Sequence, residues 1–174
     1  EGLGNEVPFF ICPYDPSEMI EIEKMVSNLH KQLGNREIKV LTINLYDISL
    51  ELLKRRGLLE RILEEEEELG KDELKELLQG VLDVEKHIIP CIKEYMDVAD
   101  FHVMFITGVG QVFPYIRSHN VLNNLQKTAK EQPTVMFFPG SYTHTLEEGA
   151  SLDLFGLLHD DKYYRAFNIY NCEI

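Results

Sequence analysis

The sequence predicts an α/β fold, in which a mostly parallel sheet of about five strands is flanked by helices. Three segments, residues 7–12, 101–107 and 134–138, are almost continuously apolar, as expected of strands buried on both faces of a sheet. Between them, apolar residues recur at the spacing of amphipathic helices. Alternation of these two patterns is typical of parallel strands joined by helical crossovers.

Length and composition predict one soluble globular domain over residues 1–174. Hydrophobic residues make up 44% of the chain and charged residues 27%, and we find no internal repeat or linker. The longest apolar runs are far shorter than a bilayer span, so we expect no membrane insertion. Thirty acidic and 17 basic residues give a net charge of -13, which makes direct nucleic-acid binding unfavourable.

Cysteine usage indicates a reducing compartment. The three cysteines, Cys12, Cys91 and Cys172, form no CxxC pair, which argues against a cysteine-based zinc finger. Cys12 and Cys91 lie in apolar runs, so we expect both in the core. The chain begins Glu-Gly rather than with Met and shows no signal peptide, so we expect its start to lie upstream.

The first third of the chain predicts a βαβ unit with a parallel pair of strands. After the strand at 7–12, Asp15 followed by Pro16 is a typical helix start, and Gly34 is a typical helix end. Apolar residues at 38–45 then predict the second strand.

A helical insertion of about 48–98 separates the second and third strands. Asp47 or Ser49 is the expected cap of its first helix, Gly57 weakens its middle and Asp83 caps a later helix. Leucines at helical spacing indicate an apolar face, and residues 64–68 are five consecutive glutamates. The segment is long for a single crossover, so it is either a docking arm with an acidic tip or a thickening of one helical layer.

The remainder predicts two strands and a helix. The strand at 101–107 leads into a turn and a helix that ends near residue 130, and the strand at 134–138 is expected to end at Pro139-Gly140-Ser141. Residues 142–151 are polar and read as a loop. Residues 155–169 show the alternation of an edge strand.

A polar cluster follows the third strand and is our candidate partner or ligand surface. Its six hydrogen-bonding residues are Arg117, Ser118, His119, Asn120, Asn123 and Asn124. They lie beyond the carboxyl end of a buried strand, where open α/β sheets bind ligands. Asparagine is a poor helix former, so each amide is expected to bond something. That partner is either a ligand or protein, or a nearby group, with Arg117 pairing Asp15 or Asp47.

Known catalytic patterns are absent from the sequence. Gly108-Val109-Gly110 lacks the third glycine of a dinucleotide-binding turn, and no Gly-Lys-Ser/Thr phosphate loop occurs, so the layering is P-loop- or Rossmann-like without the phosphate-binding motif. Ser118 and His119 are neighbours that diverge on a helix, so they do not form a nucleophile and base. His144, His159, Asp160 and Asp161 lack metal-site spacing. We expect no catalytic residues, metal or cofactor.

Several stretches resemble one protein family along essentially the whole chain. They are GLGNEVPFFICPYDP, INLYDISLELLKRRGLLERIL, FITGVGQVFPYIRSHNVLNNLQ, PTVMFFPGSY and DDKYYRAFNI. These segments look like the BrxB family of BREX phage-defence systems. The resemblance implies a small cytoplasmic component of a multi-protein antiviral system that includes a methyltransferase, a large ATPase and the phosphatase-like protein PglZ. It supplies no catalytic residues.

Our leading hypothesis is therefore a non-catalytic accessory or scaffold protein that binds other BREX components. The resemblance makes a PglZ-type protein the first expected partner, and a homo-oligomer is left open. The alternative is a cryptic nucleotide-binding or hydrolytic α/β domain that uses the crevice after the third strand.

Overall fold

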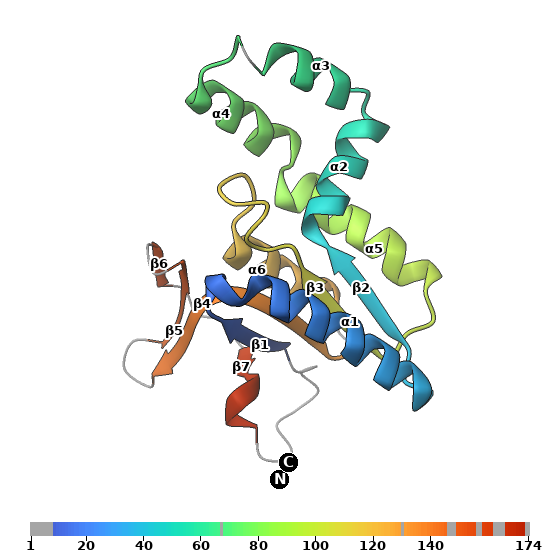
Figure 1. Cartoon of the computed structure of the whole chain (residues 1–174). Coiled ribbons are helices and arrows are strands. Elements are labelled where there is room, and N and C mark those ends of the chain that lie inside the picture. Colours follow the sequence, from blue (N-terminus) through green and yellow to red (C-terminus); the bar gives the residue numbers. More distant parts are fainter. Residues whose placement is uncertain are drawn as a thin grey trace.

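Five parallel strands form the central sheet of the computed structural model, which describes residues 9–66, 68–129, 131–145, 149–155, 158–161 and 166–172 (Figure 1). The strands are β1 (Phe9–Tyr14), β2 (Val40–Asn44), β3 (Val103–Thr107), β4 (Thr134–Thr145) and β7 (Ala166–Asn168), in the spatial order β2-β3-β4-β1-β7. The predicted α/β class, its mostly parallel sheet and the helical insertion between strands 2 and 3 are confirmed.

The predicted pairing of the first two strands is wrong. β1 lies between β4 and β7, whereas β2 is an edge strand that pairs with β3 alone. The connection through α1 (Met19–Asn35) therefore passes over two intervening strands. A helix of this length spans about 25 Å, so it can join strands that are not neighbours.

Alternate residues of the strands supply two cores, one on each face of the sheet. Phe9, Ile11, Met104 and Ile106 belong to the larger core, together with residues of the insertion and of α6 (Ser118–Thr128). Cys12, Phe105, Val135 and Phe137 belong to a smaller core against Val26 of α1. One face of the sheet is thus covered by many helices and the other mainly by α1 (Figure 1).

The insertion forms a projecting arm. Its helices are α2 (Leu45–Arg55), α3 (Leu59–Glu65), α4 (Lys71–Val81), the π-helix η2 (Val84–Ile88) and α5 (Ile89–Val98). β2 leads directly into α2, so the arm leaves the sheet at its carboxyl edge, and α3 and α4 stand farthest from the sheet (Figure 1).

The caps of the arm differ in part from the prediction. Asn44, rather than Asp47 or Ser49, caps α2, because its Oδ1 accepts hydrogen bonds from the backbone N–H groups of Tyr46 (2.9 Å) and Asp47 (3.4 Å). The predicted cap at Asp83 is confirmed, since its carboxylate accepts from Lys86 N at 2.8 Å. Asp15 likewise caps the short 3-10 helix η1 (Pro16–Glu18) that opens α1.

The segment expected to be a loop after Pro139 is instead a hairpin. β4 continues to Thr145 and pairs antiparallel with β5 (Gly149–Leu154), which pairs with β6 (Leu158–Asp161). Gly140 permits the continuation, because at its φ of 154° an added Cβ would lie 2.0 Å from the carbonyl oxygen of Asp153. The Tyr142 hydroxyl, buried in the core, donates to the carbonyl of Ala166 at 2.7 Å and ties the hairpin to β7.

Of the described residues in the predicted edge strand at 155–169, those of β7 join the parallel sheet, whereas those of β6 pair with β5. β7 pairs with β1, and the 3-10 helix η3 (Ile169–Asn171) follows it. Tyr163, Tyr164 and Arg165, part of the expected alternation, lie outside the described residues. Cys12 and Cys91 are buried as expected, and Cys172 is exposed.

Candidate functional site

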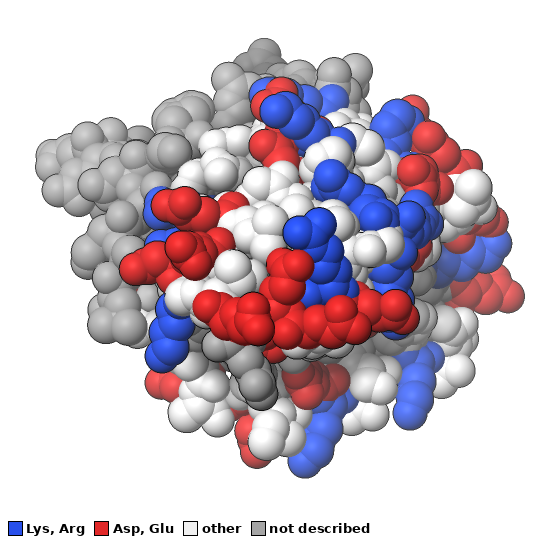
Figure 2. All heavy atoms as spheres, turned by 90° about the horizontal axis from the view of Figure 1, so that it is seen from above, with Lys and Arg blue, Asp and Glu red and all other residues white. Residues whose placement is uncertain are grey.

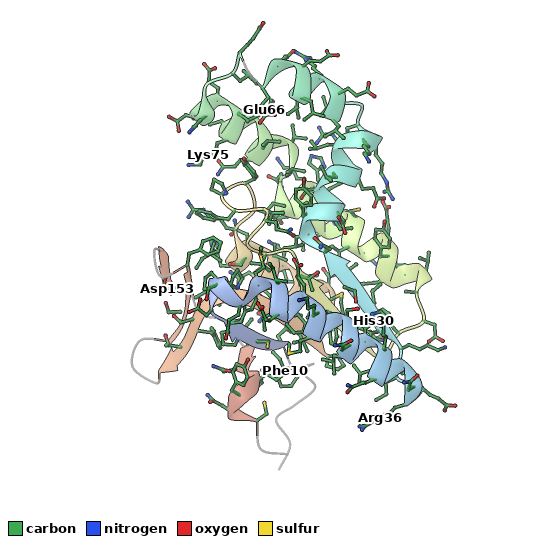
Figure 3. The ribbon with its side chains drawn as sticks, viewed as in Figure 1. Phe10, His30, Arg36, Glu66, Lys75 and Asp153 are labelled. Atoms are coloured by element: carbon green, nitrogen blue, oxygen red, sulfur yellow. The ribbon has the colours of Figure 1, made fainter. Side chains whose placement is uncertain are left out.

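A crevice opens at the carboxyl edge of the sheet, where α1 passes over the ends of β2 and β3. Its volume is about 300 Å³. The residues that line it are Tyr14, Met19, Ile22, Glu23, Val26, Ser27, His30, Thr42, Asn44, Thr107, Gly108, Gly110, Gln111 and Phe137. Figure 3 labels His30 where α1 passes β2. The crevice therefore occupies the position at which open α/β sheets bind ligands.

Two strand ends meet closely in its wall. β2 ends at Asn44, and β3 ends at Thr107 just before Gly108. Gly108 has a φ of 73°, and an added Cβ would lie 2.2 Å from Asn44 Oδ1, the atom that caps α2. Only glycine allows this approach, so the backbone itself forms that part of the wall.

Polar groups in the crevice are uncharged, apart from Glu23 and the titratable His30. The Thr42 hydroxyl and His30 Nδ1 lie 3.4 Å apart and join the sheet to α1. Burial raises the pKa of the Tyr14 hydroxyl above its usual value, and the negative charge of Glu23 raises it further. Because neither lysine nor arginine is among the described residues that line the crevice, a phosphate group would find no permanently charged cation there.

The described residues bring together no group of three His, Cys, Asp or Glu side chains that could hold a metal ion. A larger hollow of about 460 Å³ lies at the amino edge of the sheet, lined in part by Lys93, Asp97 and Asp100. Lys93 pairs with Asp97 at 2.8 Å and Asp100 with Lys39, which leaves Glu131 as the lining charge without an ion pair among the described residues. The crevice at the carboxyl edge is therefore the better candidate for a ligand.

The predicted polar cluster lies on α6, on the opposite face of the sheet from α1. None of its six residues lines the crevice. Arg117, the N-cap residue of α6, and Asn120 are exposed, and Ser118, Asn123 and Asn124 are half-buried. His119 is 3% exposed and belongs to the interior. The part of the cluster open to a partner is thus centred on Arg117 and Asn120.

Contacts within α6 account for one of the amides. Asn124 Nδ2 donates to the carbonyl oxygen of Asn120 at 2.9 Å, and Lys127 Nζ donates to Asn124 Oδ1 at 3.5 Å. Among the described residues Arg117 forms no ion pair, so the expected pairing with Asp15 or Asp47 is not observed. Arg117 therefore presents its charge to solvent.

The tip of the arm carries many charges of both signs. Its exposed carboxylates include Glu60, Glu64, Glu66, Glu68, Asp72, Glu73 and Glu76. Figure 2 looks down onto the arm and shows a band of acidic side chains beside a group of basic ones. Glu66 and Lys75, labelled in Figure 3, lie on this part of the molecule.

An aromatic strip, formed by Phe10, Phe167 and Tyr170, lies on the α1 face of the sheet. Phe10 and Phe167 face each other across β1 and β7, with ring centroids 6.1 Å apart. Tyr170 Oη lies 3.7 Å from Cys12 Sγ. This hydrogen bond is the main cause of a raised pKa of Tyr170, and the negative charge of the nearby Glu18 raises it further. Phe167 is 55% exposed and Tyr170 67% exposed. The strip is therefore fixed at its base and open to solvent.

Among the described residues, α1 is the only α-helix on this face. Its buried Val26 packs near Cys12, Phe105 and Phe137, whereas the described part of the chain places the short η3 at the β7 end of the face. Parallel sheets are normally covered on both faces, so the aromatic strip is an unusual exposed surface. Figure 3 shows Phe10 at this end of the sheet.

A crevice after the third strand was predicted from the sequence, but with the polar cluster as its lining instead of the residues that line it here, and the aromatic strip was not predicted as a site. Gly108 and Gly110 were a signal for the crevice, because they follow a buried strand, but the contribution of α1 depends on tertiary structure. The signal for the strip was Phe167, whose alternation with Ala166 places it on the face opposite to the buried Ala166.

No described helix is both long enough and apolar enough to cross a membrane.

A family model with the description BREX protein BrxB matches residues 41–169. A protein of Bacillus cereus (strain H3081.97) named BREX protein BrxB is 37% identical over 173 residues, which cover 97% of this chain and 86% of that protein. A second protein named BREX protein BrxB, from Escherichia coli O9:H4 (strain HS), is 30% identical over 168 residues, which cover 97% of this chain and 80% of that protein. No solved structure matches the chain.

Proposed function

This chain belongs to the BrxB family of BREX proteins, and from that premise we propose that it is a cytoplasmic, non-catalytic accessory protein that binds another component of a BREX phage-defence system. The observation that carries the proposal is the aromatic strip. A PglZ-type protein is the first partner to test, because the family resemblance of the sequence points to it.

The strip has the composition of a binding hot spot. Aromatic residues dominate the energetics of protein interfaces, particularly where they are held rigidly and lose little entropy on binding. Phe167 is held by β7 against Phe10, and Tyr170 by its contact with Cys12. Both side chains nevertheless expose more than half of their surface.

The chemistry around the strip specifies what the partner must present. A helix or loop with an apolar face would complete the cover that a parallel sheet usually has. Glu18, which is exposed and lies close enough to Tyr170 to influence its pKa, favours a lysine or arginine beside that apolar face. The partner segment is therefore amphipathic with a basic edge.

A second proposed contact is the accessible part of the polar cluster at the start of α6. It consists of Arg117, Ser118 and Asn120, with the half-buried Asn123 and Asn124. An exposed arginine without an ion pair among the described residues is suited to a carboxylate of a partner. The acidic tip of the arm is a third surface, and it would require a basic partner. The three surfaces make separate predictions under mutation.

The test is binding of the purified chain to the PglZ-type protein and to other proteins of its own BREX system, by co-elution and calorimetry. We expect Phe167→Glu and Tyr170→Glu each to weaken binding by about 2 kcal/mol, which is roughly 30-fold. Val98→Glu is the matched control, because Val98 is an apolar residue that is 85% exposed on α5. Circular dichroism would verify that all three variants remain folded.

Two results would contradict the proposal. Co-elution with none of the system proteins would remove the accessory role. Binding that is unchanged in the Phe167 and Tyr170 variants but lost in Arg117→Glu would move the interface to α6 and reject the aromatic strip.

A further inference from the structure

We propose that the crevice beneath α1 binds an uncharged aromatic heterocycle that carries an amino group, of the size of a nucleobase or nucleoside. This inference goes beyond the accessory role and does not depend on it, since the crevice and the aromatic strip use different residues. Four properties of the crevice carry the proposal.

The first property is position and size. The crevice lies at the carboxyl ends of β2 and β3, beneath α1, with a volume of about 300 Å³. Ligand pockets start at roughly this volume, so the crevice suits a small molecule rather than an extended cofactor.

The second property is its apolar surface. Ile22 and Val26 of α1 face Phe137 of β4, which belongs to the same core, and Met19 also lines the crevice. Tyr14 adds a second aromatic ring at the end of β1. Apolar and aromatic walls favour binding of a flat aromatic ring, because the ring buries apolar surface against them.

The third property is the hydrogen-bonding capacity around these walls. Ser27, Thr107 and Gln111 add hydroxyl and amide groups, and the wall at Gly108 exposes backbone in place of a side chain. Heterocycles with ring nitrogens and exocyclic groups match such a mixture of donors and acceptors.

The fourth property is charge. Among the described residues of the lining, Glu23 is the only carboxylate, neither lysine nor arginine is present, and His30 is the one other side chain that can carry a charge. A carboxylate accepts hydrogen bonds from an amino group but repels phosphate. The crevice therefore discriminates against nucleotides, which separates this proposal from a phosphate-binding domain.

The experiment measures binding of adenosine, guanosine and cytidine to the full chain by calorimetry and NMR, with AMP, GMP, CMP and ATP as matched phosphorylated probes. We expect at least one nucleoside to bind, and its 5′-phosphate to bind about tenfold more weakly. Glu23→Gln should weaken nucleoside binding about tenfold, and Ser27→Trp should abolish it by filling the crevice.

Glu21→Gln is the matched control, because Glu21 is an exposed glutamate on the same helix that does not line the crevice. Its affinity should equal that of the unmodified chain. The proposal is overturned if no nucleoside binds at about 10 mM, if a nucleotide binds more tightly than its nucleoside, or if Glu21→Gln and Glu23→Gln have equal effects. Retained partner binding in Glu23→Gln would show that the accessory role is separate.

Discussion

At the scale of single residues, Gly108 links the fold to the crevice. Its φ of 73° turns the chain at the end of β3, and Asn44 Oδ1 occupies the space where a side chain would begin. The same oxygen accepts the hydrogen bonds that start α2. One glycine therefore permits both the closeness of two strand ends and the capping of the arm.

We predict that Gly108→Ala lowers the free energy of unfolding by about 2 kcal/mol or more, because alanine is strained at this φ and displaces the cap. Urea denaturation followed by circular dichroism would measure the change. Gly80→Ala is the control, since an added Cβ at Gly80 in α4 meets nothing within 4 Å. There alanine should raise the free energy of unfolding by about 0.5–1 kcal/mol. Equal effects at both positions would contradict the role of Gly108.

The residue scale also shows what sequence reasoning could and could not find in the candidate site. Spacing placed the polar cluster on one helix, and the structure confirms that α6 begins at Ser118. The spacing of the residues could not show that His119 is buried while the nearby Arg117 and Asn120 are exposed. That division depends on which side of α6 packs on the sheet, a tertiary property.

At the scale of elements, polar contacts link helices of the arm to one another and to the segment after β3, beside the apolar core that the arm shares with the sheet. Arg56 Nη1, beyond the end of α2, donates to the carbonyl of Val81 at 2.8 Å. Gln79 Nε2 donates to the carbonyl of Pro114 at 3.1 Å and connects α4 to the segment after β3. Val81 is the last residue of α4, where carbonyl groups lack a partner within the helix.

We predict that Arg56→Ala loosens α4 without unfolding the protein. The Val81 carbonyl would lose its donor, so amide hydrogen exchange at the end of α4 should quicken about fivefold, equivalent to about 1 kcal/mol of local stability. Exchange in β3 and β4 should not change. Lys54→Ala, at an exposed lysine of the same helix without an ion pair among the described residues, serves as the control. A comparable increase in that variant would show that the Arg56 bond is not responsible.

The strands themselves were easier to predict from the sequence than their order in the sheet. Continuous apolar runs identified β1, β3 and the first part of β4, because strands buried on both faces need apolar residues at every position. Strand order is not encoded in such runs. The sequences of β1, its following helix and β2 look like those of two neighbouring parallel strands joined by a crossover helix. In the structure, however, β3 and β4 lie between β1 and β2. The hairpin of β4 and β5 was missed because polar residues dominate its outer positions.

At the scale of the whole molecule, the dominant feature is excess negative charge. The chain has 30 acidic and 17 basic residues and a net charge of -13. Five ion pairs join described residues, and all of them lie at the surface. Surface pairs contribute at most about 1 kcal/mol each and often nothing, whereas the unpaired carboxylates repel one another throughout the folded state.

We therefore predict that repulsion outweighs the ion pairs at neutral pH, so that added salt stabilises the protein. Between about 0.01 and 0.15 M NaCl the Debye length falls from about 30 to 8 Å, which screens distant repulsions more than close pairs. Thermal unfolding should then occur about 2–4 °C higher, equivalent to about 1 kcal/mol. At pH 5, close to the isoelectric point of 4.8, the net charge is small and the increase should largely vanish. A lower unfolding temperature in salt at pH 7 would mean that the ion pairs dominate.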